Sequence, residues 1–383
     1  MSRGTPKRVL QCAVVSIFIL GALWYPTLGR KRPHRPVQDR AETFQPNHAV
    51  RGGHYVGSEA CTACHADKVK TQKATPMGTA FFFSKDSAIL RGNPRLTFQE
   101  GPFSYHVNTS KGKTTFTVSD GKTTVSEPVE WAFGKGLAGQ TYVFLHNGAY
   151  VEGRVSYYTG VKNLDITVGH SPAIPRSIED ALGRPMGADE TRACFGCHTS
   201  RAAGPHDLQL DKITPGVTCE SCHGPGEKHI TAIKAAKLDE ANIFNPGSLN
   251  TEDLSNFCGA CHRTWEQVGL MGVRGVNNVR FQPYRLTNSK CYDADDRRIS
   301  CVACHDPHQD LRQDAAYYDS KCTACHTSDA KAAQSGNRIA AVCKVGKQNC
   351  TSCHMARYDL PGGHYKFNDH DFRIIRPGDP YPD

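Results

Sequence analysis

Residues 216–226 read Gly-Val-Thr-Cys-Glu-Ser-Cys-His-Gly-Pro-Gly, and Cys219, Cys222 and His223 within them form a Cys-x-x-Cys-His motif. This pattern occurs seven times in the chain of 383 residues, which contains 17 Cys and 18 His. Random placement of that many Cys and His would give about 0.04 copies. In chain order, the first to seventh motifs are Cys61-Cys64-His65, Cys194-Cys197-His198, Cys219-Cys222-His223, Cys258-Cys261-His262, Cys301-Cys304-His305, Cys322-Cys325-His326 and Cys350-Cys353-His354.

The spacing within the motif is that of c-type haem attachment. The two thiols form thioethers with the vinyl groups of one porphyrin, and the adjacent His becomes the proximal ligand of the iron. Zinc sites and disulfides also use cysteine pairs, but neither needs a His after the second Cys in every copy. We therefore expect seven covalently bound haem c groups, with the 14 motif cysteines as attachment sites and the seven motif histidines as proximal ligands.

The positions of the motifs predict how the chain is organised. The first motif is separated from the second by 133 positions, whereas the other six lie within the last 190 residues. Only 38% of the residues are apolar, so we expect a mainly α multihaem cytochrome c fold with few regular elements and a core packed with haems. The shortest intervals separate the second from the third motif and the fifth from the sixth, and these pairs are expected to lie closest.

The segment between the first two motifs has a different pattern. Apolar and polar residues alternate from Leu96 to Val125, with turn signals at Gly101-Pro102, Lys111-Gly112 and Asp120-Gly121. A second alternating stretch surrounds Asn147-Gly148. Such alternation with Gly-containing turns favours antiparallel hairpins. We expect a small β-rich insert at 90–165, serving either as a structural lid over the first haems or as a docking surface for a partner.

The N-terminus predicts export. Arg3, Lys7 and Arg8 precede an apolar run at 9–29, which is typical of a secretory signal. Positive residues follow the run at once, and positive charge there resists translocation, so residues 1–35 are either a signal peptide or an N-terminal membrane anchor. We expect a linker at 36–55, a first haem segment at 56–89 and a six-haem domain at 166–383, located in the periplasm or at the cell surface.

Eleven histidines lie outside the motifs, and some are candidates for the distal position on the iron. Electron-carrying multihaem irons are usually six-coordinate, so a His close to a motif is a candidate ligand, although a lone His is also common as a surface or core residue. The four best placed are close in sequence to the third, fifth and seventh motifs, and they are His229, His308, His364 and His370. Two more, His206 and His170, lie near the second motif.

Several segments resemble the multihaem cytochromes of the cytochrome c-554 type. They are residues 216–226, Cys304-His305-Asp306-Pro307-His308, and the ending with Cys353-His354-Met355, Gly363-His364 and Asp369-His370. The resemblance covers about residues 55–375. It implies a small helical haem domain with stacked, mostly bis-His haems that passes electrons between respiratory partners. Related lineages include the multihaem nitrite reductases and hydroxylamine oxidoreductases, which are enzymes.

One stretch departs from this family. Relatives often carry a Ser-x-His segment after the first haem, whose His is a distal ligand, whereas the similar stretch here is Thr75-Pro76-Met77. If Met77 takes that position, its thioether would bind an iron and raise its reduction potential. The alternative is that Met77 packs in the core.

Two further cysteines in the exported part, Cys291 and Cys343, belong to no motif. They either form a disulfide, which is the interpretation that we prefer, or remain two free buried thiols.

Two functions remain open from the sequence. In the first, every iron is six-coordinate and the protein transfers electrons between respiratory partners, such as other cytochromes or a membrane quinol-oxidising complex. In the second, one open haem makes the protein an oxidoreductase acting on a small nitrogen or sulfur species. Every motif ends in His, and none has the Lys proximal ligand associated with the nitrite reductases, which favours the first. The net charge is +9, but the sequence has no basic patch or aromatic platform that would indicate binding of nucleic acid.

Overall fold

The computed structural model describes residues 46, 53–204, 207–241, 243–336, 338–376 and 378–382. All of them belong to one compact unit, residues 44–383. The expected signal or anchor at 1–35 and most of the linker at 36–55 lie outside the described residues. Among the helices that are described, none combines the length and apolar character that a membrane span requires.

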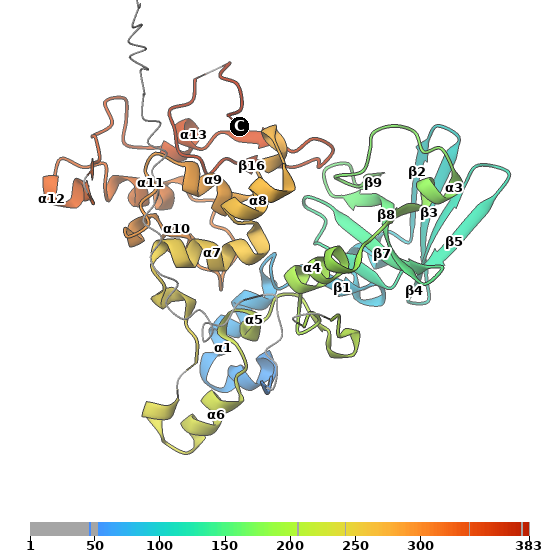
Figure 1. Cartoon of the computed structure of the whole chain (residues 1–383), viewed down its shortest axis with the longest axis horizontal. Helices are drawn as coiled ribbons and strands as arrows, with labels where there is room; N and C mark the ends of the chain where they lie inside the picture. The colour runs from blue at the N-terminus through green and yellow to red at the C-terminus, as the bar shows by residue number, and fades with distance from the viewer. Residues whose placement is uncertain are drawn as a thin grey trace, which may run out of the picture. The chain divides into compact units, whose positions relative to one another are not determined.

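Two antiparallel sheets follow the first helix, α1 (Ser58–Ala74), and Figure 1 shows their strands gathered together. One sheet has the order β1-β6-β7-β8-β10, with β9 also paired to β8, and the other has the order β2-β3-β4-β5. The bounds are β1 Phe81–Phe83, β2 Arg95–Glu100, β3 Phe103–Ser110, β4 Lys113–Ser119, β5 Thr124–Pro128, β6 Trp131–Phe133, β7 Gln140–His146, β8 Ala149–Tyr158, β9 Asn163–Ile166 and β10 Gly183–Pro185.

Two hairpins have turns that their sequence requires. Ser110 pairs with Lys113 across β3 and β4, which leaves Lys111-Gly112 as a two-residue turn with φ of 50° and 75°. The turn between β7 and β8 is Asn147-Gly148, with φ of 50° and 79°. Two-residue turns with positive φ at both positions match the twist of the strands that they join, and they favour Asn and Gly.

The remaining described helices are short. Those that carry motifs are α4 Ala188–His198, α5 Cys219–His223, α7 Thr251–His262, α10 Cys301–Cys304, α11 Ala315–Thr323 and α13 Cys350–His354. The others are α2 Ala88–Gly92, α3 Ile178–Leu182, α6 Glu227–Lys234, α8 Trp265–Met271, α9 Gln282–Asn288 and α12 Ala330–Ala333. Single 3-10 turns lie at Ser84–Asp86, Leu210–Lys212, Leu238–Glu240, Pro246–Ser248, Gly275–Asn278 and Arg297–Ile299. Because isolated helices of this length are marginal in water, these helices depend on their neighbours.

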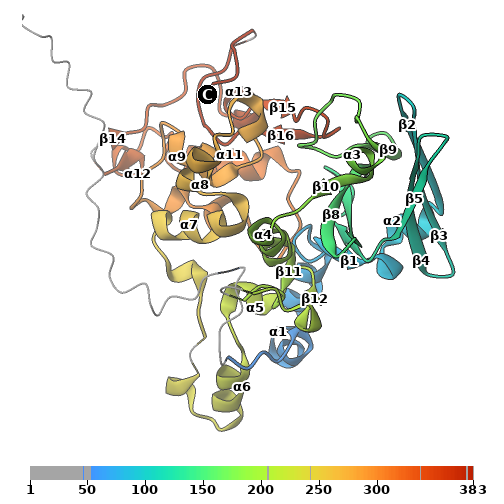
Figure 2. The ribbon, with the colours of Figure 1, turned by 45° about the vertical axis from the view of Figure 1, so that its right-hand side comes forward.

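The largest apolar core lies in the β-sheets. Alternate residues of β3 and β4 are fully buried, among them Tyr105 and Phe116, and the Phe116 ring lies 5.1 Å from that of Phe144 on β7. A second cluster joins β1 and β6 to Phe195 of α4, whose ring lies 5.1 Å from that of Phe133. The β-sheets therefore pack directly against the helix that carries the second motif, as Figure 2 also shows.

The expectation of a mainly α fold with a haem-packed core and one small β insert was wrong. Helices make up 36% and strands 22% of the structure, with several antiparallel sheets. Strands extend beyond the expected insert, to β1, β10 and three two-stranded sheets, which are β11 Thr199–Ser200 with β12 Thr214–Pro215, β13 Gln334–Ser335 with β14 Arg338–Ile339, and β15 Arg357–Asp359 with β16 Lys366–Asn368. The physical reason is that the alternating strands bury enough Phe, Tyr and Val to form a core of side chains.

Replacing Phe116 by Ala tests this core. The ring is fully buried between Tyr105 and Phe144, so we expect the free energy of unfolding to fall by about 3–5 kcal/mol. Leu145→Ala is the control, since Leu145 on β7 is 38% exposed and its loss should change stability by about 0.5 kcal/mol. Urea denaturation measures both, and equal effects would contradict this description of the core.

Candidate functional site

The 14 motif cysteines all carry free thiols with accessible surface. The first Cys begins the helix in α5, α10 and α13, whereas in α4 and α7 the motif forms the last turn. Twelve of the 14 are partly buried, and the two exposed ones, Cys64 and Cys353, belong to the first and seventh motifs. The motif cysteines are therefore free thiols arranged along helical turns.

Four motif histidines are oriented as metal ligands usually are. The Nδ1 atoms of His198, His223, His326 and His354 lie 3.0, 2.8, 2.7 and 2.9 Å from the backbone carbonyl oxygens of Ala80, Phe244, Ala341 and Arg373. A carbonyl can only accept a hydrogen bond, so Nδ1 carries the proton and Nε2 keeps its lone pair. Metal-binding histidines are commonly fixed in this tautomer by such a bond.

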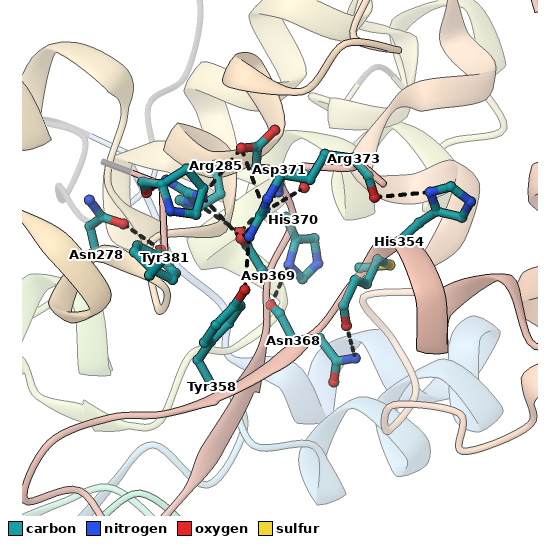
Figure 3. Close-up of polar contacts among 12 residues, drawn as sticks. Asn278, Arg285, His354, Tyr358, Asn368, Asp369, His370, Asp371, Arg373 and Tyr381 are labelled. Atoms are coloured by element: carbon teal, nitrogen blue, oxygen red, sulfur yellow. Dashed lines mark hydrogen bonds and ion pairs between the residues drawn. The ribbon is translucent and has the colours of Figure 1, made fainter. Parts of the chain in front are cut away.

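Two histidines outside the motifs show the same arrangement. His229 Nδ1 lies 2.6 Å from the carbonyl oxygen of Ala241, and His370 Nδ1 lies 3.0 Å from that of Asn368 (Figure 3). Burial, with a contribution from His305, lowers the pKa of His370 to about 4. Its imidazole is therefore neutral at pH 7, with Nε2 available as a ligand.

Two pairs of histidines have the separation expected of axial ligands on one iron. The ring centres of His223 and His308 are 6.1 Å apart with the ring planes at 16°, and those of His305 and His370 are 6.2 Å apart with the planes at 43°. A metal bound by two imidazole nitrogens at about 2 Å each would hold the ring centres about 6 Å apart. These separations agree with an iron between the rings of each pair, and ligation by His308 and His370 stays a prediction.

The other candidate distal ligands have less support from the geometry. His364 Nε2 lies 2.7 Å from Asp165, and His170 Nε2 lies 3.1 Å from Glu152, so in both rings the nitrogen needed for iron faces a carboxylate. Met77 lies in the turn after α1, where its carbonyl oxygen accepts a hydrogen bond from Val217, at 2.9 Å, just before the third motif. His206 is outside the described residues. Ligation by these residues stays a prediction.

Thiols from different motifs lie close enough to affect each other's pKa. Burial raises the pKa of the Cys61 thiol in the first motif, and the nearby Cys219 of the third motif adds to the rise. The same kind of effect on the pKa links the second motif to the fourth, the fourth to the fifth and the sixth to the seventh, through Cys197 and Cys261, Cys258 and Cys301, and Cys322 and Cys350. Figures 1 and 2 show two of these neighbours, with α1 beside α5 and α11 beside α13.

In two further pairs of neighbouring motifs, a cysteine of one motif affects the pKa of a cysteine in the other. Hydrogen bonding and burial raise the pKa of Cys258 and Cys261 in the fourth motif, and the nearby Cys222 of the third adds to the rise. Burial raises the pKa of Cys322 in the sixth motif, and Cys304 of the fifth adds to it. The motifs therefore form a continuous row in the order first, third, fourth, fifth, sixth and seventh, with the second beside the fourth. We call this arrangement the motif row.

Two buried carboxylates fasten neighbouring motifs to each other. Glu220, inside the third motif, accepts hydrogen bonds from the backbone amides of Val56 and Gly57, at 2.9 and 2.8 Å, just before α1 and the first motif. Asp319 of α11 accepts from the amides of Asn349 and Cys350, at 2.7 and 2.8 Å, at the start of the seventh motif. Each carboxylate satisfies amides at a helix N-terminus that otherwise lack partners. Neither residue was predicted from the sequence, although Glu220 lies between two motif cysteines.

The two cysteines outside the motifs are not joined in the structure. Cys291 is a partly buried free thiol 3.2 Å from the hydroxyl of Ser289, whereas Cys343 is a free thiol in an exposed position. The predicted disulfide between them therefore has no support from their geometry.

Replacing Glu220 by Gln should loosen the contact between the first and third motifs. The Gln side chain has one acceptor oxygen and an NH2 group that cannot accept from an amide, so a buried backbone donor loses its partner. We expect the free energy of unfolding to fall by about 2 kcal/mol. The control is Glu227→Gln, an exposed residue in α6, and denaturant titration measures both. Indistinguishable stabilities would contradict this role of Glu220.

Asp319 should make the contact between the sixth and seventh motifs sensitive to acid. Burial raises its pKa, but hydrogen bonds from the amides of Cys350 and Asn349 outweigh it, so the pKa lies below the ordinary 3.8. Folding therefore favours the ionised carboxylate, and its contribution to stability is present above about pH 4 and is lost as the pH falls through the folded-state pKa.

The variant Asp319→Asn should unfold at a lower denaturant concentration than the parent at pH 7, and the gap should close as the pH falls below 3.8. Unfolding curves measured over a series of pH values test this, with Asp211→Asn at an exposed position as the control. A gap that stays constant with pH would show that the Asp319 charge does not matter.

Comparison with known proteins supports the same chemistry. A family model described as cytochrome c554 and c-prime matches residues 176–224, which contain the second and third motifs. No curated protein and no solved structure matches the chain. The family match supports a c-type cytochrome with covalently bound haem c and a haem-based role in electron transfer.

Proposed function

We propose that this chain is an exported c-type cytochrome that binds haem c at each of its seven motifs and transfers electrons between respiratory partners. The two cysteines of each motif would hold the porphyrin, and the following His would bind the iron. Haem c supplies an iron centre that gains and loses one electron reversibly. His308 and His370 would be the distal ligands opposite His223 and His305, and the Nδ1 bond of His229 leaves its Nε2 free for the same role.

The observation that carries this proposal is the motif row. Each motif has a thiol close to a thiol of the next, so groups attached to them would be neighbours from the first motif to the seventh. A conduit needs such continuity, whereas an isolated cofactor site does not. The two exposed motif cysteines, Cys64 and Cys353, lie in the motifs at opposite ends of the row. This placement supports entry of electrons at one end and exit at the other.

The proposed location is the periplasm or the cell surface, with residues 1–35 as a signal peptide or an anchor to the inner membrane. The proposed partners are other cytochromes or a membrane quinol-oxidising complex. The basis is the basic segment before the apolar run at 9–29, because covalent haem attachment and respiratory electron exchange both suit an exported protein.

Reductive titration tests the number and type of iron centres. The protein as purified should take up about seven electrons per chain, one per motif, and its ferric spectrum should be that of low-spin, six-coordinate haem. Cyanide should leave that spectrum unchanged. A high-spin ferric signal, with binding of cyanide or nitrite, would contradict the conduit and favour an oxidoreductase with one open haem.

Removing single motifs tests the row. Replacing both Cys258 and Cys261 by Ala should remove the fourth motif and divide the row, whereas replacing both Cys350 and Cys353 should only shorten it. Both variants should take up about one electron fewer. After rapid mixing with limiting reductant, only the fourth-motif variant should show slow redistribution of electrons among its haems in stopped-flow spectra. Equal kinetics in the two variants would contradict the proposed order.

A further inference from the structure

A buried ion cluster lies at the C-terminal end of the chain (Figure 3). Asp369 is 0% exposed and Arg285 of α9 is 1% exposed. Their contact is bidentate, with Arg285 Nε 2.8 Å from Asp369 Oδ1 and Nη2 3.0 Å from Oδ2. Arg373 also contacts Asp369, and Asp371 lies 3.4 Å from Arg285 and 3.6 Å from Arg373. We call these four residues the ion cluster.

The ion cluster is fully partnered, which buried charges require. Two guanidinium groups face two carboxylates, so the charges balance. Arg285 Nη1 donates to the carbonyl oxygen of Pro382 at 3.2 Å, and its guanidinium lies 4.7 Å from the ring centre of Tyr381. Arg373 Nη2 donates to the hydroxyl of Tyr358 at 2.9 Å. A buried ion pair contributes little net stability compared with apolar packing, whereas its fixed geometry can hold a segment in place.

The segment that the ion cluster holds carries contacts to two candidate iron ligands. His370 follows Asp369 directly, and its Nδ1 bonds to the carbonyl oxygen of Asn368. His354 of the seventh motif bonds through Nδ1 to the carbonyl oxygen of Arg373 at 2.9 Å. The side chain of Asn368 also donates to the carbonyl oxygen of Met355 at 3.1 Å, next to His354. Residues 368–373 therefore orient both imidazoles, and Asp369 and Asp371 fix these residues to Arg285 of α9.

We propose that Arg285 is a positioning residue for haem ligation. Its bidentate contact with Asp369 holds residues 368–373 so that His370 faces His305 and the carbonyl of Arg373 orients His354. This inference rests on the proposed function, since it takes the three histidines to be iron ligands. It gives Arg285, which lies outside every motif, control over the distal ligand at the fifth motif, whereas His354 is held by its own motif and takes only its ring orientation from this segment.

The chain contains a matched control. Arg154 on β8 makes a similar buried bidentate contact with Glu100 on β2, with side chains 5% and 7% exposed, and it also donates to the carbonyl oxygen of Ala173 at 3.0 Å. This pair lies in the β-sheets and holds no motif residue. Arg285→Lys and Arg154→Lys therefore remove the same kind of contact at similar burial, and only the first should act on iron.

The test uses full-length haem-loaded protein and two readouts, electron paramagnetic resonance of the ferric form and binding of carbon monoxide by the ferrous form. Arg285→Lys should alter or lose the low-spin signal of about one haem and should allow about one equivalent of carbon monoxide to bind. Arg154→Lys should give the parent spectra and bind none. His370→Ala should reproduce the change, and Arg285→Lys added to His370→Ala should increase carbon monoxide binding no further.

These measurements distinguish a failure of the positioning role from a failure of the proposed function. If His370→Ala binds carbon monoxide but Arg285→Lys keeps the parent spectra, the positioning role is wrong while ligation by His370 stands. If His370→Ala changes nothing, the assignment of His370 fails and the inference with it, whereas a full haem content would leave the proposed function intact. If Arg154→Lys gives the same spectra as Arg285→Lys, the effect is general destabilisation and the inference is overturned. Should Arg285→Lys yield no haem-loaded protein, Arg373→Lys, at a side chain 17% exposed, should give the same spectral change.

Discussion

The contact between cysteines of different motifs is the constraint on which the rest of this structure depends. Each motif occupies only a turn or two of helix, too little to be stable alone, so its position is set by its neighbours. Glu220 and Asp319 show how this is achieved, because each is a buried carboxylate that binds the N-terminal amides of the next motif in the row. The motifs keep their sequence order in the row except for the second, which lies beside the fourth.

The antiparallel sheets support the motif row at the second motif. Their core of Phe, Tyr and Val extends to Phe195 of α4, so the helix of the second motif is packed against β1 and β6. The carbonyl oxygen of Ala80, before β1, also receives the Nδ1 bond of His198. The second motif lies beside the row rather than at one of its ends, and it is the motif most closely attached to the sheets. The ion cluster around Asp369 has a comparable role at the fifth and seventh motifs.

The sequence allowed local features to be predicted better than the arrangement in space. Asn147-Gly148 indicates a tight hairpin because the turn conformation depends on these two residues alone. The nearness of Cys61 and Cys219 could not be predicted, because 158 positions separate them. The number of residues between two positions sets only the greatest distance that can separate them in space. His308 and His370 lie opposite motif histidines, whereas His364, which is closer in sequence to the seventh motif than His370 is, faces Asp165. The mixed fold was not predicted, because several strands lie outside the alternating stretches, in two-stranded sheets too short to give a period-two pattern.

The mass of the intact, denatured protein tests the central claim most directly, because thioether bonds survive unfolding whereas other haem contacts do not. The account predicts the mass of the polypeptide plus seven haems, and peptide mapping should find one haem on each of the seven cysteine pairs. A mass equal to that of the bare polypeptide, or cysteine pairs that react freely with alkylating reagents, would contradict it.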